Sequence, residues 1–152
     1  MIQKRIYVDT SVLGGVFDDE FRKPSQQFFG QVKQGRFTLI VSPVVVREIS
    51  QAPIEVQEFF EETLVYAELV DVTQEALRLR AAYLREKILP SKYSDDALHV
   101  AIASVSMCSM IVSWNFKHIV HYEKIPLYNA VNILNGYGEI AIYSPWEVIH
   151  YA

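Results

Sequence analysis

The sequence predicts an α/β fold: a three-layer sandwich with a mostly parallel central sheet flanked by helices. Short apolar runs alternate along the chain with longer segments of helical periodicity, which is the pattern of strand–helix–strand units. Pro, Gly, Ser and Thr residues separate these segments. No repeat or low-complexity linker divides the 152 residues, and 51% of them are hydrophobic, so we expect a single domain over residues 1–152.

The first half of the chain is predicted to alternate strands with helices. Gly14–Gly15 interrupts a short helix that follows the first strand. Pro24 suits the first turn of the next helix, and Gly35 ends that helix before a β-rich run. Ser42–Pro43 opens a helix that carries Glu48. The predicted elements are, in order, a strand at 5–8, helices at 11–17 and 24–34, a strand at 37–41, a helix from 43 onward and a helix at 54–62.

The second half continues the alternation. Thr73 is predicted to cap a long helix that ends near Lys87, and Pro90 marks the break after it. Ser94 is predicted to cap the helix that carries Asp95 and Asp96. The predicted elements are, in order, a strand at 68–72, helices at 73–87 and 95–105, a strand at 110–113, a helix at 122–134, a strand at 140–143 and a terminal turn at 145–149.

Charge and cysteine content restrict the function classes. The formal net charge is −4, so the chain lacks the strongly basic footprint of proteins that bind nucleic acid by bulk charge, and any such contact must be local. Cys108 is the only cysteine, which excludes an intramolecular disulfide and fits a small buried side chain in a reducing compartment. No long uncharged apolar stretch occurs, and we expect a cytoplasmic protein without a membrane contact.

Acidic residues stand where apolar elements begin or end. Asp9 follows the first predicted strand, where a carboxylate is costly unless it is paired, hydrogen-bonded or bound to a cation. An N-cap role and a metal-ligand role suit it equally well. Asp95 and Asp96 also fit the favourable charge of a helix N-terminus, and Glu48 beside Arg47 also fits a solvated face.

The combination of these segments resembles the PIN-domain family. In that family a first strand ends in Asp followed by Thr or Ser, a mid-chain helix bears Glu, a later helix opens with Asp-Ala-Leu-His, and an acidic position follows a later strand. The corresponding segments here occur in the same order and span nearly the whole chain, at residues 7–11, 46–49, 95–101 and 112–119. The resemblance implies a metal-dependent endoribonuclease similar to VapC, the toxin of bacterial and archaeal VapBC toxin–antitoxin pairs.

Carried over position by position, the resemblance implies that Asp9, Glu48 and Asp96 are catalytic and that they bind Mg²⁺ or Mn²⁺. Asn115 stands where many family members have aspartate. Its amide oxygen can still contact a cation but contributes no charge, which weakens the site. The resemblance also implies an RNA substrate, a small antitoxin protein as partner, and a homodimer.

Further residues are candidates for supporting the carboxylates or holding RNA. His99 lies three residues after Asp96 on one helix face and either orients it or is a satisfied buried histidine. Trp114 is compatible with stacking on a base or with packing, and we expect Phe116 to pack in the core. Lys92 is a further candidate for contact with RNA. The remaining supporting or substrate-contacting candidates are Thr10, Ser11, Arg47, Asp95, Ser113, Lys117 and His118.

Two other function classes stay open. Asn115 makes a catalytically weakened PIN-like adaptor that binds metal or RNA a reasonable alternative to the nuclease. An aspartyl-phosphate hydrolase also begins with an aspartate at the end of a strand. That class normally has a second aspartate two residues later, where this chain has Ser11, so it is the weakest of the three.

Overall fold

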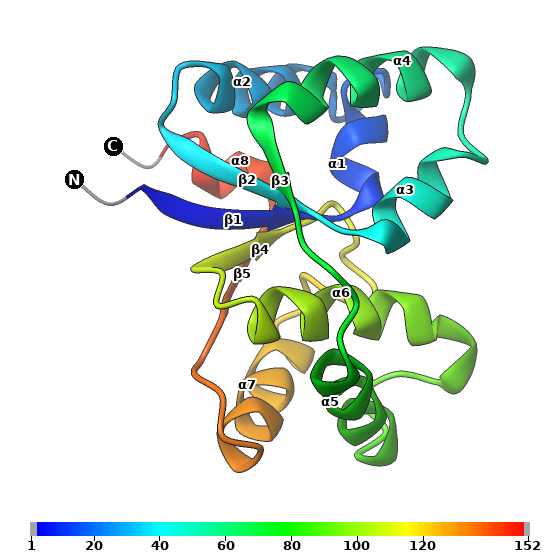
Figure 1. Cartoon of the computed structure of the whole chain (residues 1–152), viewed down its shortest axis with the longest axis vertical. Coiled ribbons are helices and arrows are strands. Elements are labelled where there is room, and N and C mark those ends of the chain that lie inside the picture. The colour runs from blue at the N-terminus through cyan, green and yellow to red at the C-terminus, as the bar shows by residue number, and fades with distance from the viewer. Residues whose placement is uncertain (1–2, 151–152) are drawn as a thin grey trace.

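The structure is a computed structural model, and it describes residues 3–150. Within them, one five-stranded sheet has the order β3-β2-β1-β4-β5, and every neighbouring pair is parallel (Figure 1). The predicted α/β fold with a mostly parallel sheet is therefore confirmed, and the described sheet is parallel throughout. Its strands are β1 (Lys4–Val8), β2 (Phe37–Val41), β3 (Ala67–Leu69), β4 (Met110–Val112) and β5 (Ala141–Tyr143).

Helices cover both faces of the sheet and complete the three layers (Figure 1). α1 to α4 lie on one face, α5 to α7 lie on the other, and α8 packs against α2. Their bounds are α1 (Thr10–Gly15), α2 (Arg22–Lys33), α3 (Pro43–Ile49), α4 (Ile54–Thr63), α5 (Gln74–Arg85), α6 (Ser94–Val105), α7 (Lys124–Leu134) and α8 (Pro145–Val148). Two short 3₁₀ helices, η1 (Leu64–Tyr66) and η2 (Ser91–Tyr93), precede β3 and α6.

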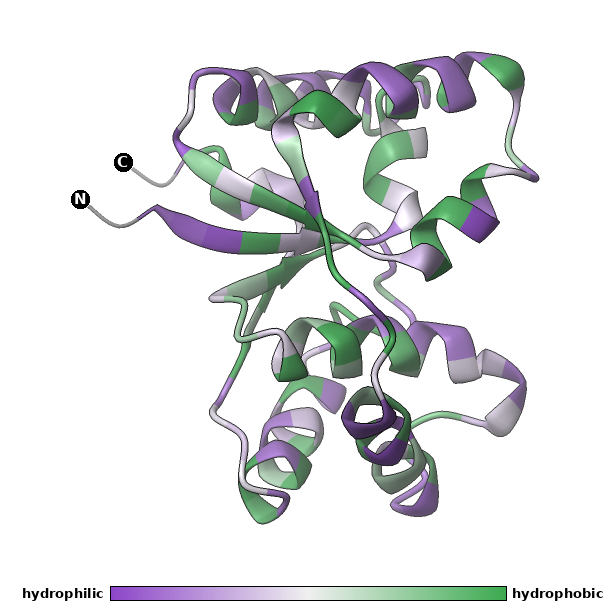
Figure 2. Cartoon of the chain, in the orientation of Figure 1, coloured by the Kyte–Doolittle hydropathy of each residue, from purple (hydrophilic) through white to green (hydrophobic). Residues whose placement is uncertain are grey.

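The core lies on both sides of the sheet. Ile6, Tyr7 and Val8 are consecutive residues of β1 and are fully buried, and the last three residues of β2 are buried as well. A parallel sheet covered on both faces requires such continuous apolar runs, because neither side of a strand meets water. Figure 2 shows hydrophobic colouring through the central strands and hydrophilic colouring over much of α5 and the outer side of α2.

Several element boundaries differ from the sequence prediction. Ser94 does not cap α6: it is the first residue of the helix, with helical backbone angles, because η2 runs directly into α6. By contrast, the Thr73 side chain accepts a hydrogen bond from Ala76 N at 3.1 Å, as predicted for the cap of α5. α1 includes Gly14 and ends at Gly15, two residues before its predicted end at 17, so the glycines close this helix and do not interrupt it. The predicted terminal turn forms the short helix α8.

Two other elements are shorter than predicted. β3 ends at Leu69 rather than near residue 72, although the next residue, Val70, still donates its N–H to Val41 O. α7 begins at Lys124, two residues after the predicted start, because His121 carbonyl accepts hydrogen bonds in a turn that precedes it. Neither change moves the carboxyl ends of β1 and β4, which position the candidate site.

Two further findings concern membrane-spanning helices and the single cysteine. Within residues 3–150 no helix combines the length and apolarity needed to cross a bilayer. Cys108 is a buried free cysteine, and burial raises the pKa of its thiol to about 12. A thiol with so high a pKa is poorly nucleophilic, so Cys108 acts as a small packed side chain.

Candidate active site

Asp9 occupies the point where β1 turns into α1 at the carboxyl edge of the sheet. Its Oδ1 accepts hydrogen bonds from Ser11 N at 3.2 Å and Ser11 Oγ at 2.6 Å, and its Oδ2 accepts one from Ser113 Oγ at 2.7 Å. Asp9 is thus the N-cap of α1, one of the two roles that the sequence left open. Ser113 follows β4, so the parallel pairing of β1 with β4 brings these two residues together.

Burial gives Asp9 a carboxyl that is costly to ionise. The side chain is almost completely enclosed, and this burial raises the pKa of Asp9 above its ordinary value. The nearby His99 and the hydroxyls of Ser11 and Ser113 act in the opposite direction without cancelling the effect of burial, and the charge of Glu48 raises the pKa further. A cation beside these carboxylates would offset the cost of burying the Asp9 charge and the repulsion between Asp9 and Glu48.

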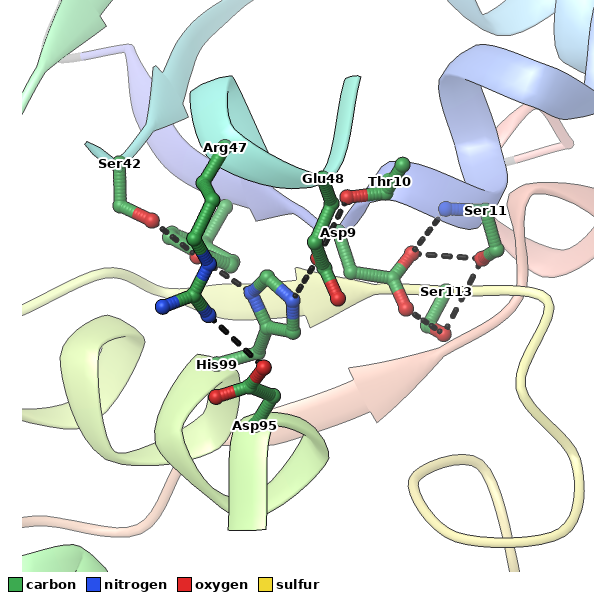
Figure 3. A network of polar contacts seen from close by, with 10 residues as sticks. Asp9, Thr10, Ser11, Ser42, Arg47, Glu48, Asp95, His99 and Ser113 are labelled. Atoms are coloured by element: carbon green, nitrogen blue, oxygen red, sulfur yellow. Dashed lines mark hydrogen bonds and ion pairs between the residues drawn. The ribbon is translucent and has the colours of Figure 1, made fainter. Parts of the chain in front are cut away.

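Glu48 is held by two side chains at the same edge (Figure 3). Its Oε1 accepts a hydrogen bond from Thr10 Oγ1 at 2.6 Å and lies 2.7 Å from His99 Nε2. Glu48 belongs to α3, which follows β2, whereas Thr10 begins α1 and His99 lies on α6. No described residue hydrogen-bonds the second carboxylate oxygen, Oε2, and the side chain keeps 30% of its surface exposed.

A buried chain of hydrogen bonds runs beneath Glu48. His99 Nδ1 lies 2.7 Å from the hydroxyl of Tyr7, and that hydroxyl lies 2.8 Å from Ser42 Oγ. Tyr7 and Ser42 were not candidates in the sequence, because both stand inside or beside apolar strands and no local pattern marks them. His99 is a satisfied buried histidine, as one of the two alternatives proposed, and its two ring nitrogens contact Tyr7 and Glu48 rather than Asp96.

Burial and hydrogen bonding act in opposite directions on the ionisation of Glu48 and His99. Burial opposes the charged form of Glu48, but hydrogen bonds from His99 and Thr10 outweigh it and lower the pKa of Glu48. Burial likewise opposes a charged His99, but the hydrogen bond to Glu48 and the charges of Asp9, Glu48 and Asp96 raise the pKa of His99. All three candidate carboxylates therefore act electrostatically on one imidazole.

The two aspartates at the start of α6 have different partners. Asp96 Oδ2 lies 3.0 Å from His118 Nδ1, and its side chain is 23% exposed. Asp95 points away from this contact and forms a 2.7 Å ion pair with Arg47, in which both side chains are largely exposed. Such an exposed pair contributes little to stability. Asp95 and Arg47 thus lie at the rim of the site, where they link α6 to α3 (Figure 3).

Asn115 shapes the turn after β4. Its amide oxygen accepts a hydrogen bond from His118 N at 2.9 Å, and its own backbone N donates to Ser113 Oγ at 2.9 Å. This turn carries His118 toward Asp96. Lys117, in the same turn, places its Nζ 6.0 Å from the centre of the Tyr93 ring.

The two aromatic residues of this segment differ from each other. Trp114 is buried, stacks on Phe21 at a ring-centre distance of 4.1 Å, and donates its indole N–H to Ser25 Oγ at 2.8 Å. Trp114 is therefore a packing residue, and its ring is not free to stack on a base. The prediction that Phe116 packs in the core is wrong: 48% of its surface is exposed, because it follows the turn outward beside Trp114.

The chemistry of the donors suits a hard divalent cation. Asp9, Glu48 and Asp96 supply carboxylate oxygens, and Glu48 Oε2 and Asp96 Oδ1 are without a hydrogen bond from any described residue. Oxygen donors of this kind are those that Mg²⁺ and Mn²⁺ prefer. Within residues 3–150, however, no three His, Cys, Asp or Glu side chains are grouped so that they could hold an ion in their present positions. Sharing of one cation by the three carboxylates stays a prediction.

Comparisons with known proteins give a match in structure but not in sequence. No protein-family model matches the chain, and no curated protein matches it. A chain of VapBC2 from Rickettsia felis, in a complex with a DNA fragment from its promoter, is similar with a TM-score of 0.60 and 14% identity, covering 92% of this chain and 98% of that one.

Two further solved structures agree. A chain of DNA-bound VapBC from Salmonella typhimurium has a TM-score of 0.58 and 16% identity, covering 95% of this chain and 99% of that one. A chain of FitAcB from Neisseria gonorrhoeae has a TM-score of 0.59 and 11% identity, covering 93% and 98%. At these identities the likeness concerns the fold. The chain therefore has a PIN-like three-layer α/β fold shared with chains of VapBC and FitAB complexes, as its sequence resemblance implied.

Proposed function

We propose that the chain is a metal-dependent endoribonuclease that cleaves single-stranded RNA and serves as the toxin of a type II toxin–antitoxin pair. The observation that carries the proposal is the arrangement around Glu48 at the carboxyl edge of the sheet. Thr10, next to Asp9, and His99, three residues after Asp96, both contact the Glu48 carboxylate. Ligand crevices of open α/β sheets lie outside that edge. Carboxylates brought together there from separate elements are typical of metal-assisted phosphoryl chemistry.

In this proposal Asp9, Glu48 and Asp96 hold Mg²⁺ or Mn²⁺, and Asn115 adds a neutral oxygen. When bound, such an ion would supply a water of lowered pKa and stabilisation of negative charge for cleavage of the phosphodiester bond. The chain itself fixes the carboxylates: Ser11 and Ser113 hold both oxygens of Asp9. Thr10 and His99 hold one oxygen of Glu48 and leave the other free, and His118 does the same for Asp96.

The partners of the chain also belong to the proposal. The similar VapBC2 and VapBC structures are DNA-bound complexes. A further solved structure of similar fold is a toxin–antitoxin complex from Klebsiella pneumoniae. We infer by likeness of fold that a small antitoxin protein binds this chain, that two copies form a homodimer, and that both act in the cytoplasm. The acidic net charge requires that RNA be held by local cations rather than by the whole surface.

An adaptor that binds metal or RNA without cleaving it is the second candidate. Asn115 favours it, because a neutral amide stands where a carboxylate would strengthen cation binding and because its oxygen is engaged by His118 N. The two candidates differ in a single observable, the metal-dependent cleavage of RNA.

The deciding experiment incubates end-labelled single-stranded RNA with the protein and Mn²⁺, with and without EDTA. The nuclease proposal expects slow cleavage that EDTA stops and that Asp96→Asn abolishes. Asp19→Asn is the control, because it removes an exposed carboxylate, paired with Arg22 and outside the candidate site residues, and it should leave cleavage within about twofold. RNA that binds but stays intact across varied sequences would favour the adaptor.

A further inference from the structure

A pocket outside the carboxylate group gathers positive charge on this acidic chain. Its volume is about 450 Å³, and we call it the basic pocket. It lies between η2, the turn after β4 and the start of α7. The polar side chains that line it belong to Lys92, Tyr93, Lys117, His118, His121 and Lys124. Among residues 3–150, no Asp or Glu lines the basic pocket, although the whole chain has 18 acidic and 14 basic residues.

The basic pocket is organised around one aromatic ring. Lys92 Nζ lies 5.1 Å and Lys117 Nζ lies 6.0 Å from the centre of the Tyr93 ring. The same ring packs on His118 with 3.9 Å between ring centres. His118 is buried, and Tyr128 donates its hydroxyl to the His118 carbonyl at 2.8 Å. Lys92 and Lys117 therefore lie over a packed pair of rings, Tyr93 and His118.

The basic pocket adjoins the candidate active site through His118. The ring that forms part of the pocket floor also contacts Asp96, with 3.0 Å between His118 Nδ1 and Asp96 Oδ2. A ligand in the pocket would therefore lie one side chain away from a candidate catalytic carboxylate. Since carboxylates repel the RNA backbone, a group of cations beside them offers the attraction that the site itself lacks.

An exposed aromatic residue, Tyr122, follows His121 of the basic pocket in the chain. Tyr122 is 81% exposed, and its ring stacks on that of His121 with a 5° angle between the planes. Lysines that follow a phosphate backbone, next to an aromatic face on which a base can stack, are the combination by which proteins hold single-stranded nucleic acid. Lysine is a point charge that suits phosphate oxygens without requiring the fixed geometry of arginine.

We propose that the basic pocket binds a backbone phosphodiester of single-stranded RNA, with the adjoining base on Tyr122. The inference rests on the proposed function, because it names how the substrate of that site is held. Lys92 and Lys117 contact the phosphate, and the His118–Asp96 contact sets the strand beside the carboxylates. The ligand is a phosphodiester flanking the bond that is cleaved.

The test measures binding of a fluorescent single-stranded oligouridylate by anisotropy in EDTA, so that cleavage does not contribute. Lys92→Gln/Lys117→Gln should weaken binding about tenfold at low salt. Each phosphate no longer neutralised lowers the slope of log affinity against log salt by about 0.7 for single strands, and both lysines contact one phosphate, so the slope should fall by about 0.7. Tyr122→Ala should weaken binding without changing the slope, because stacking releases no counterions.

The control is Lys23→Gln/Lys33→Gln, which removes the same charge from exposed lysines of α2 on the other face of the sheet. It should bind RNA as the wild type does. Equal affinity and slope for wild type and the pocket variant would overturn the basic pocket, while cleavage by the wild type would still support the nuclease. A reduced slope in a protein that never cleaves RNA would support the pocket and overturn the nuclease. If the pocket variant loses binding to polyglutamate but keeps its binding to RNA, the basic pocket is a site for acidic protein segments and the proposal is overturned.

Discussion

His99 Nε2 lies 2.7 Å from Glu48 Oε1, so a buried imidazole on α6 holds a carboxylate on α3. Two arrangements of protons satisfy this contact. In a neutral ring, Tyr7 donates to Nδ1 and Nε2–H donates to Glu48; in a charged ring, both nitrogens donate and the Tyr7 hydroxyl can donate to Ser42. Burial raises the pKa of Tyr7 well above its ordinary value, so its hydroxyl keeps its proton in either arrangement.

The pH dependence of stability should reveal the charge on His99. The pKa of His99 in the folded chain is raised above the ordinary 6.5. The stabilisation that protonated His99 gives is therefore complete below pH 6.5 and is lost as the pH rises through the folded-state pKa. The difference in free energy of unfolding between wild type and His99→Gln should therefore be largest in mild acid and shrink toward alkaline pH. Urea unfolding in EDTA measures it. A difference that stays constant over this range would mean that His99 is neutral in the folded chain.

Tyr7→Phe should destabilise the fold by about 1 to 2 kcal/mol, because it removes the hydroxyl that joins Ser42 to His99 and leaves both buried groups short of a partner. The ring itself, and so the packing of β1, is unchanged. Tyr143→Phe is the matched control: its side chain is 43% exposed on β5, and the change should cost less than about 0.5 kcal/mol. Equal losses in the two variants would deny the buried chain any role in stability.

Added Mn²⁺ should raise the melting temperature of the wild type, since an ion that binds only the folded state stabilises it by mass action. Asp9→Asn should remove most of that rise. The amide oxygen can still accept from Ser11 and cap α1, so the variant should fold. Differential scanning fluorimetry with and without Mn²⁺ gives the two shifts, and equal shifts would place the ion elsewhere.

Asn115→Asp should increase the rate of RNA cleavage or lower the Mn²⁺ concentration that it needs, because an added anion strengthens cation binding. A carboxylate oxygen can accept the same hydrogen bond from His118 N, so the turn should be preserved. Cleavage rates over a Mn²⁺ titration compare the two proteins. If wild type and variant are both inert, the adaptor displaces the nuclease.

Gly15→Ala should destabilise the chain by about 2 kcal/mol and perturb the fluorescence of Trp114. A Cβ at Gly15 would lie 2.5 Å from Ser25 Oγ and 2.8 Å from Trp114 Nε1, two atoms already hydrogen-bonded to each other. Gly14→Ala is the control in the same helix. It meets nothing within 4 Å and should be neutral or stabilising, since alanine favours a helix. Thermal unfolding monitored by circular dichroism compares them.

The sequence by itself determined the layers of this fold. Continuous apolar runs such as that of β1 occur because both faces of a parallel strand are covered, and the alternation with helical segments dictates parallel pairing. It also determined the position of Asp9 at the sheet edge and the cap at Thr73, since both depend on neighbours within three residues. Ser94 shows the limit of such local rules, because the preceding 3₁₀ turn took over the start of α6.

Only the tertiary structure decided which side chains meet. Spacing on α6 placed His99 near Asp96, but the packing of that helix against the sheet turns its ring toward Tyr7 and Glu48, from elements distant in sequence. Asp96 instead meets His118, which the turn after β4 carries to it. The basic pocket arises in the same way, because Lys92 and Lys117 share the Tyr93 ring across a separation that no local periodicity encodes. Such contacts depend on how whole elements pack, and hydrophobic burial rather than local propensity sets that packing.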